Sequence, residues 1–441
     1  MDQLRQFQSS RFFTVAVVFL GGFTDLCIYS VIIPIIPFIL NDLNESESWI
    51  GVLLALYGVG IVAGSLLFGS LVYKGKISKK YGMVASLAIL AAAITLFAVS
   101  KSIALFAFAR FLQGFSSCGV WVLGLAFVAD VYDGDEKNLG KVMSYIFTGL
   151  ALGQLVGPPV GGWLYHYGQI YPFVFSGALV VLDLIGRLLI VEPSNMKEVA
   201  VASDALSIEA SSIVTPTCET PSVKTLLNKD LIIICTMCFV FSVCFTQLEP
   251  TLPLYLNYLY LYNSAQIGSI WLAFVLPNIV GGLLGGWLYD KYGIRKRSVL
   301  AIPLAMLSLL FLAIPGPSNS IVWLSILLGY CGCIFGVIFA PVAPGISASV
   351  PKEYNTVGYV LMNLVFSLGI AVGPLSGGFL YEKIGWNWQQ AIFAIIMVFI
   401  VPMGFWMPKS GSVVAVETST LDSDDVSTEN RGVSLGAIIV K

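Results

Sequence analysis

The stretch "IGVLLALYGVGIVAGSLLFGSLVYK", residues 50–74, decides the fold. Before its closing lysine it holds only apolar and small residues, and it exceeds the roughly 20 positions that a helix needs to cross a bilayer. A similar stretch, "IGSIWLAFVLPNIVGGLLGGWLYDK", occupies residues 267–291, which is 217 positions later. Two such segments indicate a membrane protein built from a duplicated unit.

Two further pairs of motifs repeat at nearly the same offset. The stretch "PIIPFIL" at 34–40 has a counterpart "PTLPLYL" at 250–256, and "GPPVGGWLYHYG" at 157–168 has a counterpart "GPLSGGFLYEKIG" at 373–385. Both pairs lie 216 residues apart and keep the same order along the chain. Parallel repeats of this kind are typical of transporters whose solute site lies between the repeats, near the middle of the membrane.

Composition supports a membrane location for most of the chain. Hydrophobic residues make up 57% of the sequence and charged residues 11%, whereas soluble domains are about 25% charged. Because backbone groups in hydrocarbon must be hydrogen-bonded internally, the apolar runs are expected to be helices. We predict an all-α membrane protein with twelve transmembrane helices in two parallel six-helix repeats. The runs fall at about 13–40, 49–73, 82–100, 103–128, 142–165, 170–191, 231–257, 267–289, 298–315, 320–348, 357–381 and 387–407.

The chain divides into four predicted segments. Residues 1–193 form an N-terminal six-helix bundle, 194–229 a polar cytoplasmic linker, 230–408 a C-terminal six-helix bundle, and 409–441 a disordered cytoplasmic tail rich in Ser, Thr and Asp. Lysines and arginines gather in alternate loops, and the positive-inside rule then places both termini in the cytoplasm. The first span is too long for a signal peptide, so we expect it to be retained.

Three acids lie within predicted spans. Asp183 has Arg187 four residues later, so a local ion pair is expected there. Asp25 and Glu249 have no cation on the same helix. A buried charge in a membrane costs several kcal/mol unless it is paired or hydrated. Asp25 and Glu249 are therefore candidates for binding a cationic solute or a proton, and a buried structural hydrogen bond is the alternative.

A cation lies inside the fourth predicted span. Arg110 and Gln113 share one helical face with Ser117 and Trp121 in the stretch "FARFLQGFSSCGVW" at 108–121. The same reasoning leaves two interpretations for this face, a buried structural pair or the lining of a cavity.

The fifth predicted span carries a ridge of small residues. Glycines at every fourth position lie on one helical face and allow another helix to approach closely. Two prolines follow, and they remove backbone donors and favour a kink. We consider plain close packing and a surface on which the two bundles bend and slide. The residues are Gly149, Gly153, Gly157, Pro158, Pro159 and Gly161, with Gly373 and Pro374 in the second copy.

A second segment that could take part in conformational change is the cytoplasmic loop "GGLLGGWLYDKYGIRKR" at 281–297. The residues that we single out in it are Gly286, Asp290, Gly293 and Arg295. Asp290 can cap the next helix and pair with arginines there. Such contacts would act as a latch that holds the two bundles in one conformation. The alternative is a simple anchor of positive charge. In the first copy Tyr73 stands in place of Asp290.

Together these motifs resemble the major facilitator superfamily over nearly the whole chain outside the linker and the tail. The 281–297 loop is similar to its signature loop, and "GPPVGG" resembles the antiporter motif of twelve-span drug:proton antiporters. The stretches "ARFLQGFSSCGVWVLGLAFVADVYDGDEKNLG", "GLALGQLVGPPVGG", "PFVFSGALVVLDLIGRL" and "LEPTLPLYL" are similar to the vesicular amine transporters, which exchange lumenal protons for amines.

The resemblance implies roles for particular residues. Asp25 and Glu249 match two acids that handle cationic substrate or protons in the amine transporters. Monoamine members also have an acid in the tenth span, where Phe339 stands here, so a monoamine substrate and the usual proton stoichiometry do not follow. The resemblance is compatible with a plasma, vacuolar or vesicular membrane.

We therefore expect a secondary active transporter, a proton-coupled antiporter of organic cations, amphipathic drugs or polyamines that works by alternating access. Its partners would be a small organic solute, protons and the lipid bilayer, and it would function as a monomer. Alternatives are a facilitator or symporter of a neutral metabolite and a non-transporting membrane receptor. No nucleophile–base pair, metal cluster or phosphate loop suggests an enzyme, a cofactor or a metal, and basic residues follow loop topology rather than nucleic-acid binding.

The repeat also places the two acids at different depths. By the 216-residue offset, Asp25 corresponds to Phe241 and Glu249 to Ile33. A difference of eight residues is a rise of roughly 12 Å along a helix. We expect the acids on opposite walls of one cavity, one binding the cation and the other the proton.

Overall fold

The computed structural model describes residues 10–74, 76–132, 136–190, 228–314, 320–340, 342–350 and 355–406. Helices account for nearly all of them, and these residues contain no strand. The predicted all-α class is therefore confirmed. The predicted tail and almost all of the predicted linker lie outside the described residues, and the division into two six-helix bundles stays a prediction.

The described residues of the first half form nine helical segments. They are α2 (Arg11–Val31), α3 (Ile36–Asp42), α4 (Trp49–Tyr73), α5 (Lys79–Val99), α6 (Ile103–Cys118), the π-helix η1 (Gly119–Gly124), α7 (Leu125–Val131), α8 (Glu136–Tyr167) and α9 (Tyr171–Leu189). Serine side chains at positions 10, 78 and 102 cap α2, α5 and α6 by accepting a backbone N–H of the first turn.

The second half holds six described helices. They are α12 (Lys229–Thr246), α13 (Leu248–Tyr260), α14 (Ser264–Ala313), α16 (Ile321–Phe339), α17 (Val342–Ser349) and α18 (Asn355–Trp406). Asn263 and Gln266 form a reciprocal capping box at the start of α14.

Nine helical stretches of the described chain are long and apolar enough to cross a membrane. The remaining predicted spans fall on α8, on the shorter apolar helix Ser298–Ala313, and in the second part of α18. The chain turns at Gly293 within α14 and at Gly385 within α18, where φ is 72° and 74°. Glycine adopts such angles without steric cost. The count of twelve crossings stays a prediction.

The repeated proline motifs mark the places where the first helix of each half is interrupted. The turn at residues 32–35 separates α2 from α3, and Gln247 separates α12 from α13. Pro34 lies in the turn between α2 and α3, and Pro250 lies in the first helical turn of α13. Proline lacks the N–H that would continue a helical ladder, so the interruption repeats where the motif repeats.

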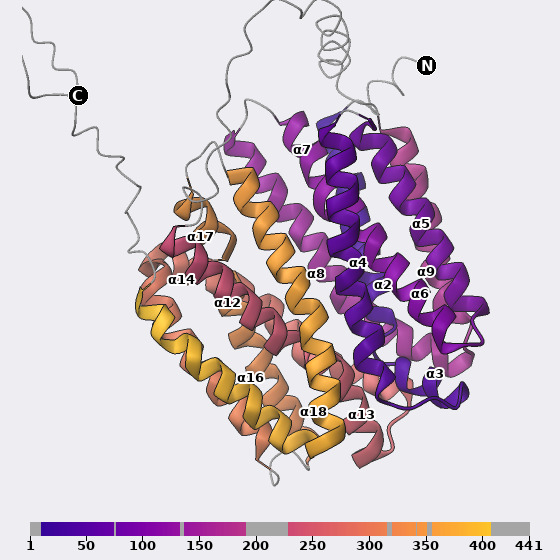
Figure 1. Cartoon of the computed structure of the whole chain (residues 1–441), viewed down its shortest axis with the longest axis vertical. Coiled ribbons are helices and arrows are strands. Elements are labelled where there is room, and N and C mark those ends of the chain that lie inside the picture. Colours follow the sequence, from indigo (N-terminus) through magenta and orange to yellow (C-terminus); the bar gives the residue numbers. More distant parts are fainter. Residues whose placement is uncertain are drawn as a thin grey trace, which may run out of the picture. The chain divides into compact units, whose positions relative to one another are not determined.

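Close helix pairs hold each half together and also join the two. Within the halves α2 packs on α8, α4 on α6, α12 on α18, and α14 on α16. Between them α8 packs on α14 and α4 on α18, and Figure 1 shows the first part of α18 running beside α4.

Candidate functional site

Asp25 is buried in the middle of α2, with 3% of its surface exposed. One carboxylate oxygen accepts from the hydroxyl of Ser117 at 2.6 Å, and the other from the indole Nε1 of Trp121 at 3.2 Å and the hydroxyl of Tyr57 at 3.4 Å. All three partners are neutral donors from α4, α6 and η1. Asp25 is therefore oriented by hydrogen bonds rather than by an ion pair.

Glu249 lies in the first turn of α13, with 2% of its surface exposed. The hydroxyl of Tyr29 donates a hydrogen bond to it. Tyr29 lies one helical turn after Asp25 on α2, and Glu249 lies on α13. This contact therefore joins the first helix of the first half to the second helix of the second half.

Arg110 is fully buried on α6 and has aromatic neighbours on one side. Its guanidinium carbon lies 4.8 Å from the ring centre of Tyr29 and 5.2 Å from that of Tyr57, which is cation–π geometry. Its Nη1 donates to Gln113 at 2.6 Å and to the carbonyl of Tyr29 at 3.4 Å. Its Nε and Nη2 have no hydrogen-bond partner among the described residues.

The tyrosine pair connects the two acids. The rings of Tyr29 and Tyr57 lie 4.3 Å apart, and their hydroxyls donate to Glu249 and Asp25 respectively. The structure thus brings Asp25, Arg110, Gln113 and Glu249 into one buried network. The sequence reasoning missed Tyr29, although its position four residues after Asp25 on a predicted helix placed it on the same face.

The glycine ridge of α8 faces α2, its neighbour within the same half. A methyl group on Gly149 would lie 2.7 Å from the carbonyl oxygen of Phe19, and on Gly153 it would lie 2.3 Å from that of Phe23. Gly157 and Gly161 make equally close approaches to the end of α2. In the second copy, a methyl on Gly373 would lie 2.1 Å from the hydroxyl oxygen of Thr246 on α12.

The prolines of the two ridges face the opposite half. A methyl group on Gly268 of α14 would lie 2.3 Å from the carbonyl oxygen of Pro158. A methyl on Gly51 of α4 would lie 2.6 Å from the carbonyl oxygen of Pro374. Pro159 continues the same helix, and α8 runs through both of its prolines. The two contacts join equivalent positions of the two copies.

The loop considered as a latch lies inside α14. Gly286 has open space where a side chain would project, and Gly293 is the residue at which the helix direction breaks. Arg295 is partly buried. Asp290 belongs to α14, but its side chain lies outside the described part of the structure, so the latch stays a prediction.

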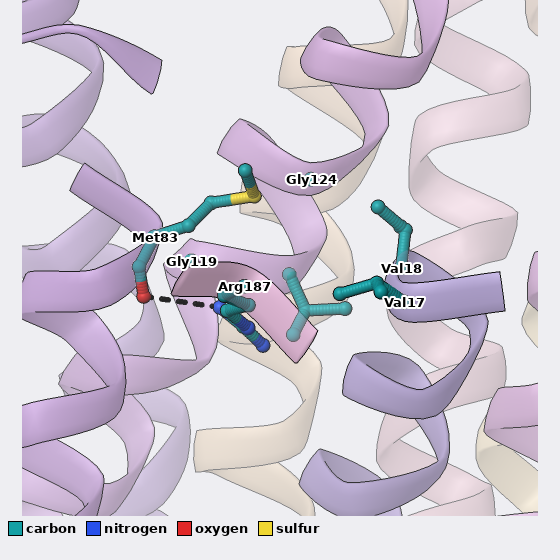
Figure 2. Close-up of a pocket in the computed structure, with 7 residues that line it drawn as sticks. Val17, Val18, Met83, Gly119, Gly124 and Arg187 are labelled. Atoms are coloured by element: carbon teal, nitrogen blue, oxygen red, sulfur yellow. Dashed lines mark hydrogen bonds between the residues drawn. The ribbon is translucent and has the colours of Figure 1, made fainter. Parts of the chain in front are cut away.

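The expected local ion pair of α9 is confirmed. Arg187 Nε donates to one carboxylate oxygen of Asp183 at 3.0 Å, and Nη2 donates to the other at 2.7 Å. Both residues are buried. Arg187 Nη1 also donates to the carbonyl of Met83 on α5 at 3.1 Å, as Figure 2 shows.

Aromatic rings occupy the position that corresponds to Asp25 in the second half. Phe241 stacks on Phe339 with ring centres 5.0 Å apart, and Phe339 packs on Phe366 at 5.2 Å. The first half therefore presents an acid and the second half an apolar wall at equivalent places of the repeat.

Comparison with known proteins agrees with this architecture. The sequence model of the Major Facilitator Superfamily matches residues 18–374. An uncharacterised MFS-type transporter of Schizosaccharomyces pombe is 30% identical over 422 residues, which is 87% of this chain and 93% of the relative. The synaptic vesicular amine transporter of Rattus norvegicus is 29% identical over 331 residues, which is 74% of this chain.

This chain spans only 60% of the rat protein's length. Among solved structures, a crystal structure of the nucleoside transporter NupG superimposes with a TM-score of 0.68, covering 90% of this chain and 100% of NupG. The two sequences are 14% identical, so this match shows a shared fold and nothing about the solute.

Proposed function

This chain belongs to the Major Facilitator Superfamily, and from that membership we propose that it is a proton-coupled antiporter of organic cations. It is a multi-pass membrane transporter rather than an enzyme. Amines, amphipathic drugs and polyamines are the proposed solutes. The amine specificity named for the rat relative makes amines the first class to test.

One observation carries the proposal: two buried acids from opposite halves are held by neutral donors alone in the described structure. Asp25 accepts from Ser117, Trp121 and Tyr57, and Glu249 accepts from Tyr29. A carboxylate buried without a bonded cation is stabilised by binding a proton or a positively charged solute. Competition between these two cations for the acids is the physical basis of antiport.

The cross-half hydrogen bond suggests how binding and movement are coupled. In this conformation Asp25, Glu249 and Arg110 are all buried. A solute reaches them only after the Tyr29–Glu249 contact opens and the halves separate on one side. Protonation or solute binding at Glu249 changes that contact, and we propose that this drives alternating access.

The remaining expectations complete the proposal. The halves 1–193 and 230–408 act as the two moving bundles. The helices that bend and slide during this movement carry Gly149, Gly153, Gly157, Pro158, Pro159, Gly161, Gly373 and Pro374. The cytoplasmic latch comprises Gly286, Asp290, Gly293 and Arg295. Both termini face the cytoplasm, the protein works as a monomer, and it resides in a plasma, vacuolar or vesicular membrane.

Proteoliposome uptake under an imposed pH gradient tests the function. A panel of amines, polyamines and neutral solutes is offered, and only cationic members should accumulate with the gradient. Asp25→Asn and Glu249→Gln should each abolish gradient-driven uptake while the protein still assembles in the membrane. Solute uptake that ignores the gradient would contradict antiport.

A neutral-solute facilitator is the second candidate, and Arg110 is the observation that favours it. Its unbonded Nε and Nη2 could donate to a hydroxyl or carbonyl of a neutral metabolite. The same panel separates the two candidates, because a facilitator equilibrates a neutral solute and leaves the pH gradient unchanged.

A further inference from the structure

Three glutamine side chains form a buried cluster in the second half. Gln247 lies between α12 and α13, and Gln389 and Gln390 lie on the last segment of α18, after the turn at Gly385. All three have an exposed fraction of 0%. Gln247 Nε2 donates to Gln390 Oε1 at 3.1 Å, and Gln389 Nε2 donates to Gln247 Oε1 at 2.5 Å. The amide of Gln247 is therefore held on both sides by this glutamine cluster.

Burial of these amides costs free energy that apolar side chains would not. Gln389 Oε1 and Gln390 Nε2 have no partner among the described residues, and an amide atom buried without a hydrogen bond is unfavourable. Turning all three amides round keeps both bonds and leaves the opposite atoms unpaired, so the bonds do not depend on which end of each amide is nitrogen. Stability alone therefore does not explain the glutamine cluster.

The repeat shows that the buried amide accompanies an acid. By the 216-residue offset Gln247 corresponds to Val31, and an isoleucine follows Val31 where Glu249 follows Gln247. The backbone packing is the same in both halves. A methyl group on Gly161 would lie 2.3 Å from the carbonyl oxygen of Val31, and one on Gly377 would lie 2.8 Å from that of Gln247. Only the side chain differs, and the polar one precedes the acid.

The chain around Gln247 has fewer helical hydrogen bonds than a regular helix. Pro250 and Pro253 lack an N–H, so the carbonyls of Thr246 and Glu249 lose the donors that a helix would supply. A single residue separates Gln247 from Glu249. A contact that holds the Gln247 side chain therefore also restrains the position of Glu249.

The segment of α18 that holds Gln247 is itself anchored. Asn387 Nδ2 donates to the carbonyl of Ala313, the last residue of α14, at 2.7 Å. The ring of Trp386 stacks on that of Tyr255 of α13, with ring centres 4.4 Å apart. The two glutamines of α18 follow within one helical turn. They therefore hold Gln247 from a fixed position.

We propose that Gln247, held by Gln389 and Gln390, is a positioning residue that keeps Glu249 in place to accept the hydroxyl of Tyr29. The three amides are uncharged, so their contacts persist whether or not Glu249 has bound a cation. Without them α13 shifts at its proline-weakened start, and the bond between the halves is lost. This inference rests on the proposed antiport, in which that bond couples binding to movement.

Combining Gln247→Met, Gln389→Met and Gln390→Met tests the glutamine cluster. Methionine is unbranched and of similar length, and no amide is left without its partner, so thermal stability in detergent should stay near wild type. Exchange in proteoliposomes should fall about tenfold, as for Tyr29→Phe alone, and adding Tyr29→Phe should cause little further loss. Losses that multiply in full, or wild-type exchange by the assembled triple variant, would overturn the proposal.

Asn278→Leu is the matched control for this comparison. Asn278 Nδ2 donates to the carbonyl of Gly332 at 3.1 Å, which is a buried amide contact between α14 and α16 of the same half. Any loss that it causes should multiply in full with that of Tyr29→Phe. If the triple variant does not assemble, Gln247→Met alone replaces it, because it breaks both bonds of the cluster and should show the same lack of additivity with Tyr29→Phe.

Infrared spectroscopy tests the position of Glu249 without any transport. The carbonyl stretch of its protonated carboxyl group, recorded at acidic pH, is the band that Glu249→Gln lacks. A hydroxyl that donates to this carbonyl lowers its frequency, so the triple variant and Tyr29→Phe should raise the frequency by similar amounts. An unchanged band in the triple variant would overturn the proposal. Wild-type protein that moves no amine with the pH gradient would instead overturn the proposed antiport and leave the infrared result standing.

Discussion

Gly268 packs so closely on Pro158 that a methyl group added at Gly268 would lie 2.3 Å from the Pro158 carbonyl oxygen. The same relationship joins Pro374 to Gly51, at 2.6 Å. Each proline belongs to the glycine-rich helix of one half, and each glycine to a helix of the other. The backbones of the two halves are therefore in direct contact at two repeat-related places.

Replacing either glycine should impair transport by preventing this approach. Gly268→Ala and Gly51→Ala each place a methyl group against a backbone oxygen that cannot rotate away. We expect initial uptake rates in proteoliposomes to fall at least several-fold for each variant, and further for the pair.

Gly282→Ala is the matched control for these substitutions. It lies on the same helix as Gly268, and a methyl group there would have nothing within 4 Å. Alanine is favoured over glycine in a helix interior by about 1 kcal/mol, so this variant should be at least as stable as wild type and transport normally. Equal loss in Gly282→Ala and Gly268→Ala would remove the contact from the mechanism.

The hydroxyl of Tyr29 should matter more than its ring. Tyr29→Phe keeps the stacking on Tyr57 and Arg110 but removes the hydrogen bond to Glu249. A hydrogen bond to a charged group contributes about 1.5–3 kcal/mol, so gradient-driven exchange should fall about tenfold or more.

Tyr165→Phe provides the comparison for Tyr29→Phe. Tyr165 donates to Asp42 at 2.8 Å, which is also a tyrosine–carboxylate bond, but both residues belong to the first half and the bond is exposed. Its loss should leave exchange near wild type. Similar rates for both variants would show that the cross-half bond does not limit transport.

Arg110→Lys should not support transport. The guanidinium is planar, lies over two tyrosine rings and donates to Gln113, whereas an ammonium is a compact, strongly hydrated charge. Gradient-driven uptake measured at equal protein amount should drop to the level of Arg110→Met. Wild-type uptake by Arg110→Lys would mean that only the positive charge is needed.

The Asp183–Arg187 pair should stabilise the first half chiefly by mutual neutralisation. Arg187→Gln alone leaves a buried carboxylate, and removing one partner of such a pair costs about 3–5 kcal/mol. Thermal denaturation in detergent should show a clear loss for Arg187→Gln and a much smaller one when Asp183→Asn is added. A double variant as unstable as the single one would contradict this account.

Sequence periodicity and the repeat anticipated much of the site. The helical spacing placed Arg110, Gln113, Ser117 and Trp121 on one face, and the structure gathers all four around Asp25 and the tyrosine pair. It also predicted the ion pair at Asp183, because an i, i+4 contact depends on one helix alone. Each of these inferences needed only local geometry.

Contacts between helices that are distant in the sequence could not be predicted from local helical geometry. The bond from Tyr29 to Glu249 spans 220 positions, and the stacked rings of Tyr29 and Tyr57 that link the two acids come from different helices. The π-helix at 119–124, which contains Trp121, is a departure from regular α-helical geometry that the sequence pattern did not indicate.

The sequence by itself determined the fold class, the repeat and the family. Hydrophobic runs, proline breaks and glycine spacing are local patterns, and a membrane requires apolar runs to form helices because their backbone groups must be hydrogen-bonded internally. Only the tertiary structure decided what each polar group meets: Asp25 with neutral donors, Glu249 with Tyr29 of the other half, and Arg187 with the carbonyl of Met83 on α5. Those outcomes depend on how helices pack across hundreds of residues, and one-dimensional spacing does not encode packing angles.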